Sequence, residues 1–136
     1  MEVYPINTGE ADVKKMLDVF WSLSTETGTV TVPLLAFLIK GGEVPILVDT
    51  GFSNPERAME KMHLGPHRTK PEWDLAEQLR KQGLKPEDIQ YVILTHLHYD
   101  HCGKCDIFPN AKFIIQRAEC SHIIKYRSCL GMHPVG

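Results

Sequence analysis

Side chains that can bind a metal ion are concentrated in one short segment, His96-Leu97-His98-Tyr99-Asp100-His101. Three histidines and one aspartate fall within six positions, directly after an apolar run. In extended backbone, residues i and i+2 point the same way, so His96 and His98 can offer ring nitrogens to one point. A turn after them would direct Asp100 and His101 to a second point. Two metal ions held about 3.5–4 Å apart in this way would form a binuclear hydrolytic site.

Imidazole nitrogens and a carboxylate suit zinc, and they also suit iron or manganese. A chance cluster of histidines on a polar loop is the alternative interpretation. Four potential ligands at this spacing, at the end of a strand, favour the metal site.

The spacing matches the His-x-His-x-Asp-His signature of the metallo-β-lactamase superfamily, which this sequence resembles. Upstream, Ile46-Leu47-Val48-Asp49-Thr50-Gly51 is similar to the Asp-Thr-Gly that ends a strand in that superfamily. Within the superfamily, residues Val32–Gly51, Leu84–Gly103 and Phe108–Glu119 most resemble the quorum-quenching N-acyl homoserine lactone lactonases.

The resemblance implies an α+β fold, the αββα sandwich, with two zinc ions at one edge of its sheets. It implies that His96 and His98 bind the first metal and that Asp100 and His101 bind the second. Asp49 would hydrogen-bond behind a ligand and fix its orientation. A metal-bound hydroxide would then open a carboxylic ester or lactone ring, with Asp100 as the catalytic residue that orients the hydroxide and accepts its proton.

Two other functions stay open. One is thioester hydrolysis of the glyoxalase II type, because the same motif serves both reactions. The other is a metal-binding half without catalysis of its own.

The chain departs from the family in length, since superfamily members are typically about twice as long and take further metal ligands from their second half. After His101 the sequence offers only His122 and His133, and neither lies in a Gly-His motif. Each metal would keep about two protein ligands, whereas zinc sites usually have three or four. The missing ligands would come from a C-terminal half that this sequence lacks, which we favour, or from a second copy in a homodimer.

Other residues with reactive or aromatic side chains receive weaker interpretations. The Cys102-x-x-Cys105 pair is interpreted as two small residues in a turn rather than a redox or metal pair. Phe20 and Trp21 are candidates for an apolar substrate pocket, with ordinary core packing equally favoured. His67, next to Gly65-Pro66, is expected on a surface loop.

The elements that must position the motif follow from apolar runs and turn residues. Strands and helices alternate, which indicates an α/β or α+β layered fold. The two runs of the predicted hairpin are almost wholly apolar, as in strands covered on both faces. The expected elements are a strand Glu2–Asn7, a hairpin of Val32–Lys40 and Val44–Asp49, a helix from Ser53-Asn54-Pro55, a helix from Pro71 to Gly83, strands Tyr91–Leu94 and Ala111–Ile115, and a helix Arg117–Lys125.

Length and charge limit the classes of protein to which this sequence can belong. The chain has 136 residues, which predicts one domain spanning residues 1–136. Its 15 Lys and Arg against 17 Asp and Glu give a net charge of −2, which argues against nucleic-acid binding by bulk charge. The longest apolar run, Val32–Ile39, is far shorter than the roughly 20 residues of a membrane span. With no visible signal peptide, a cytoplasmic protein acting on a small-molecule ester is expected.

Overall fold

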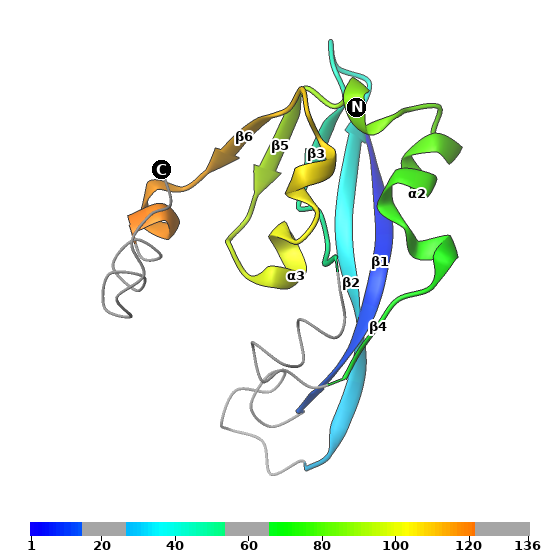
Figure 1. Cartoon of the computed structure of the whole chain (residues 1–136), viewed down its shortest axis with the longest axis vertical. Coiled ribbons are helices and arrows are strands. Elements are labelled where there is room, and N and C mark those ends of the chain that lie inside the picture. The colour runs from blue at the N-terminus through cyan, green and yellow to red at the C-terminus, as the bar shows by residue number, and fades with distance from the viewer. Residues whose placement is uncertain (15–26, 54–65, 122–136) are drawn as a thin grey trace.

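A six-stranded mixed sheet organises the molecule. The computed structural model describes residues 1–14, 27–53 and 66–121, and Figure 1 shows the arrangement of its elements. The strands lie in the order β4-β1-β2-β3-β5-β6. Their bounds are β1 Glu2–Lys14, β2 Thr29–Lys40, β3 Ile46–Val48, β4 His67–Arg68, β5 Tyr91–Leu94 and β6 Lys112–Ile115.

Strand direction changes across this sheet. β1 pairs antiparallel with β2 and β4, and β2 pairs antiparallel with β3. β3, β5 and β6 are parallel to one another. Parallel neighbours need a crossover connection, and the chain between β3 and β5 contains a helix, α2. The carboxyl ends of β3 and β5 therefore lie side by side at one edge of the sheet, where parallel sheets commonly bind ligands.

Short helices fill the connections. They are η2 Pro71–Trp73, α2 Leu75–Lys81, η3 Pro86–Asp88, α3 Tyr99–Cys102 and η4 Cys105–Ile107, and residues 117–121 are also helical. Asp74 caps α2, because its side chain accepts a hydrogen bond from the backbone N–H of Glu77. None of the helices in the described part of the chain has the length and apolarity to cross a membrane.

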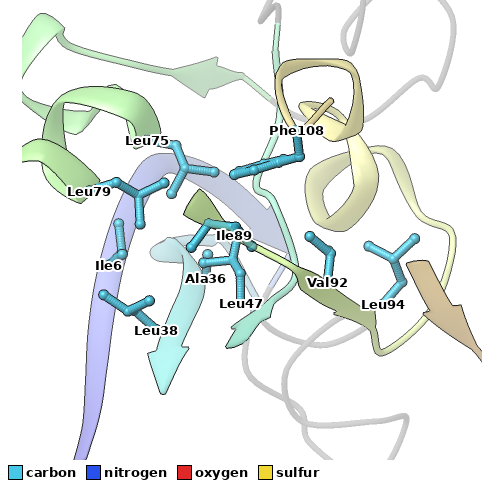
Figure 2. Close-up of a cluster of buried hydrophobic side chains, with 10 residues drawn as sticks. All are labelled: Ile6, Ala36, Leu38, Leu47, Leu75, Leu79, Ile89, Val92, Leu94 and Phe108. Carbon is cyan, nitrogen blue, oxygen red and sulfur yellow. The ribbon is translucent and has the colours of Figure 1, made fainter. Parts of the chain in front are cut away.

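One face of the sheet carries the main hydrophobic core, which Figure 2 shows. Leu75 and Leu79 of α2 are fully buried and belong to one cluster with side chains from β1, β2, β3 and β5. Ile89 and Phe108, from the connections, complete the cluster. The strand residues in it are Ile6, Ala36, Leu38, Leu47, Val92 and Leu94.

The opposite face of the sheet is also apolar but is only partly covered. Along β2 the buried residues alternate with half-buried ones, and the register carries this alternation across β3 and β5. Val3 is 55% exposed and Ile114 is 48% exposed. On the hairpin strands themselves the described residues are mostly buried on one face and half-buried on the other, so the prediction that both faces are covered is met only in part. The partly covered face comprises Val3, Pro5, Leu35, Phe37, Ile39, Ile46, Val48, Tyr91, Ile93 and Ile114, and we call it the open face.

The predicted elements are largely confirmed where they can be compared. The strand Tyr91–Leu94 has the predicted bounds, while β1 runs seven residues beyond the predicted end at Asn7. The helix predicted from Pro71 begins as a 3₁₀ turn and continues as α2. The helix predicted from Ser53-Asn54-Pro55 lies outside the described residues.

Candidate metal centre

The motif lies where two parallel strands end together. Asp49 directly follows β3, and Thr95 and His96 directly follow β5. The backbone N–H of Asp49 donates to the carbonyl of Ile93, at 2.9 Å, and continues the pairing of the two strands by one residue. The parallel pairing therefore brings together two segments that are 46 residues apart in the sequence.

The loop after β3 is fixed against the turn that follows the motif. The backbone N–H of Thr50 donates to the carbonyl of His101 at 2.7 Å, and the N–H of Gly103 donates to the carbonyl of Gly51 at 2.8 Å. Asp49 itself has φ of 60°, the only non-glycine with positive φ in the described residues. Such a conformation is costly and persists only where surrounding contacts hold it, which is typical of functional sites.

The four motif side chains meet in two pairs. Nε2 of His96 lies 3.0 Å from Nδ1 of His98. Nε2 of His101 lies 3.5 Å from a carboxylate oxygen of Asp100. The rings of His96 and His101 are adjacent, with their centroids 4.0 Å apart, so the two pairs form one cluster.

Asp49 lies behind this cluster. Its carboxylate is buried and sits 2.8 Å from Nδ1 of His101. It also accepts hydrogen bonds from the backbone N–H of Thr95 at 2.8 Å and from the Thr95 hydroxyl. Burial disfavours the charged carboxylate, but the hydrogen bonds from His101 and Thr95 outweigh burial and lower the pKa of Asp49. Asp49 is therefore a buried anion that can only accept hydrogen bonds.

The two central histidines have opposite pKa shifts. Partial burial, together with the neighbouring His101 and His98, lowers the pKa of His96. The hydrogen bond to Asp49 raises the pKa of His101, despite partial burial. Neutral imidazole is the form that binds a metal, and the lowered pKa keeps His96 in that form near neutral pH.

The donor set suits a metal ion but is incomplete. Because Nδ1 of His101 faces Asp49, Nε2 of that ring is directed to the side where Asp100 lies. One pair offers two imidazole nitrogens and the other an imidazole nitrogen and a carboxylate, which are donor types that zinc binds. Within the described ranges, however, no three His, Cys, Asp or Glu side chains are grouped so that they could hold one ion together.

Of the other residues singled out from the sequence, some lie outside the described part of the chain and some lie within it. Phe20 and Trp21 lie outside the described residues, as do His122 and His133. Partial burial raises the pKa of the Cys102 thiol to about 11 and raises that of Cys105, which does not suit a redox pair. The surface-loop prediction for His67 is wrong, because β4 places it in the interior.

Sequence reasoning did not single out Thr95, whose hydroxyl contacts both Asp49 and His96. The available signal was its position between the end of an apolar strand and the first motif histidine.

Comparison with known proteins shows which family the chain belongs to. Residues 31–122 match the family model of the metallo-beta-lactamase superfamily. An N-acyl homoserine lactonase of Bacillus cereus is 37% identical over 108 residues, which are 72% of this chain and 42% of that protein. N-acyl homoserine lactonase AiiB of Agrobacterium fabrum is 31% identical over 103 residues, which are 71% of this chain and 37% of that protein.

A solved N-acyl homoserine lactone hydrolase has the same fold over the part that aligns. It was determined with N-hexanoyl-L-homoserine bound at its catalytic metal centre. The alignment has a TM-score of 0.74 at 29% identity and covers 90% of this chain and 51% of that one. The chain thus spans about half the length of the relatives it matches. The mixed sheet and its helices are part of the αββα fold, and the chain belongs to the metallo-β-lactamase superfamily.

Proposed function

We propose that this chain carries the His-x-His-x-Asp-His half of the metal site of a hydrolase that opens N-acyl homoserine lactones. The observation that carries the proposal is the grouping of the four motif side chains into two adjacent pairs at the shared end of β3 and β5, with Asp49 behind them. The similarity to lactonases from two bacteria supports the substrate class.

The donor set favours zinc, and iron or manganese would also accept these ligands. His96 and His98 would hold one ion, and Asp100 and His101 would hold the other. Bound metal supplies Lewis acidity that lowers the pKa of water and polarises a carbonyl group.

The chain's own residues have separate tasks in the proposed reaction. Water adds to the lactone carbonyl carbon, the ring C–O bond breaks, and the alkoxide gains a proton to give an N-acyl homoserine. The Asp100 carboxylate is partly exposed, and so it can reach the attacking water and take its proton. Asp49 is buried and holds the ring of His101 in place instead of touching substrate.

Two donors for each metal are fewer than a zinc site uses. We propose that the remaining donors come from the rest of a longer protein, since the chain spans about half the length of its relatives. A homodimer that joins two motif loops is the competing source.

Elemental analysis and substrate assays test the proposal. The purified 136-residue chain should retain fewer than two zinc ions after desalting. With added zinc, the hydrolysis that it catalyses should favour N-hexanoyl homoserine lactone over a thioester. Two tightly held ions per chain, together with a dimer in sedimentation, would favour the homodimer. Faster cleavage of the thioester than of the lactone would show that thioesters are the substrate class. Zinc binding without hydrolysis of either compound would leave metal binding as the function of the chain alone.

A further inference from the structure

We propose that Thr95 is a positioning residue that holds the proton of His96 on Nδ1 and so presents Nε2 of that ring to the metal. The inference rests on the proposed metal site and deepens it, because it assigns a role to a residue outside the His-x-His-x-Asp-His motif.

The Thr95 hydroxyl lies between a carboxylate and an imidazole. Its Oγ1 is 2.8 Å from Oδ2 of Asp49 and 3.1 Å from Oδ1. The same oxygen is 3.0 Å from Nδ1 of His96. The backbone N–H of Thr95 also donates to Oδ1 of Asp49, at 2.8 Å, which fixes Thr95 against the carboxylate.

The number of protons available decides the direction of these hydrogen bonds. An ionised carboxylate accepts hydrogen bonds and cannot donate, while a hydroxyl has one proton to give. The Thr95 hydroxyl therefore donates to Asp49 and has only lone pairs left for His96. The contact with His96 is a hydrogen bond only when Nδ1 of that ring carries the proton.

The free nitrogen of His96 then faces the site. With the proton on Nδ1, Nε2 has a lone pair, and this is the atom that lies 3.0 Å from His98. Asp49 acts on His101 in the same way but directly, because its Oδ2 lies 2.8 Å from Nδ1 of that ring. One buried carboxylate thus determines which nitrogen carries the proton in two rings. It acts on His101 by direct contact and on His96 through Thr95.

Neutral imidazole nitrogens can be distinguished by long-range ¹H–¹⁵N correlation spectra of the metal-free chain at about pH 9, well above the ordinary pKa of histidine. We expect His96 to carry its proton on Nδ1 in the wild-type chain. In Thr95→Val, which keeps the shape of the side chain and removes the hydroxyl, His96 should shift toward the Nε2–H form. Thr95→Ser should restore Nδ1–H, and His101 should keep Nδ1–H in every variant as an internal control.

Zinc affinity gives a second measurement that is independent of turnover. Removing a group that orients a ligand typically weakens metal binding by about 10–100-fold. We expect a loss in that range for Thr95→Val and near wild-type affinity for Thr95→Ser. Thr31→Val is a matched control, since that hydroxyl binds Asp12, away from the motif.

Different results would overturn the role of Thr95 and the proposed metal site. A wild-type His96 protonated on Nε2, or a tautomer and zinc affinity unchanged in Thr95→Val, would overturn the role of Thr95 and leave the metal site standing. A wild-type chain with the expected tautomer that takes up no zinc when titrated with the ion would overturn the proposed function, whereas zinc lost only on desalting would not.

Discussion

At the scale of single residues, Asp100 is the side chain on which the proposed chemistry depends most. In the proposed site it would combine a carboxylate ligand for the second metal with a proton acceptor for the attacking water. We expect Asp100→Ala to lower zinc stoichiometry and to reduce lactone opening by about 10³-fold or more, while the thermal unfolding midpoint changes little. Asp106→Ala is the control, because Asp106 is exposed on η4 outside the motif. Near-normal turnover in Asp100→Ala would show that the binuclear assignment is wrong.

Cys102 offers a test of pH dependence. Burial raises the pKa of its thiol to about 11, so the reactive thiolate is scarce near neutral pH. Alkylation by iodoacetamide in zinc-free buffer at about pH 8 should therefore be about 100-fold slower at Cys102 than for a free thiol, as peptide mass spectrometry can measure. Alkylation of Cys102 as fast as that of a free thiol would show that the Cys102 side chain is not buried.

The unfolded chain releases the proton of this thiol near pH 8.5, so the contribution of Cys102 to the free energy of unfolding falls from there towards pH 11.

At the scale of elements, the loop after β3 sets the position of Asp49. Gly51 has φ of 67°, and a Cβ there would lie 2.2 Å from the buried Thr8 hydroxyl oxygen. Gly83 has a similar φ of 76°, but among the described residues no atom beyond its chain neighbours lies within 4 Å of the place a Cβ would take. Both substitutions to alanine incur the left-handed backbone penalty of about 1 kcal/mol, whereas only the first adds a clash.

We expect Gly51→Ala to lower the free energy of unfolding by about 3 kcal/mol or more, and Gly83→Ala by about 1 kcal/mol, in urea titrations. Equal losses would show that the contact between Gly51 and Thr8 does not constrain the loop. Zinc affinity should follow the same order, because displacing the loop moves Asp49 away from His101.

Local patterns predicted most single elements but not their partners. Tyr91–Leu94 is β-branched and apolar, and α2 begins after a proline turn and ends before a glycine, so each carries its own signal. The parallel pairing of β3 with β5 joins segments separated by a helix, and no local pattern specifies it. The motif residues could be recognised by spacing alone. The role of Thr95 could not, since it depends on where the tertiary fold places Asp49.

At the scale of the whole molecule, the open face is an apolar surface that the described residues cover only in part. Its apolar side chains come from β1, β2, β3, β5 and β6, so it extends across most of the sheet. Contiguous apolar surface of this kind marks an interaction site. The chain spans about half the length of its relatives, and we propose that the rest of a longer protein covers this face.

The isolated chain should therefore self-associate and bind a hydrophobic dye through the open face. Ile114 and Phe113 are neighbours on the edge strand β6 and are 48% and 41% exposed. Ile114 pairs with Ile93 on the open face, and Phe113 pairs with Val92 on the opposite face. Ile114→Lys puts a charge on the open face, and we expect it to reduce both dye binding and the sedimentation coefficient. Phe113→Lys, the matched control, should leave both nearly unchanged. A wild-type chain that sediments as a monomer without binding dye would contradict the exposure of this face, and an equal response of the two variants would place the association at the strand edge instead.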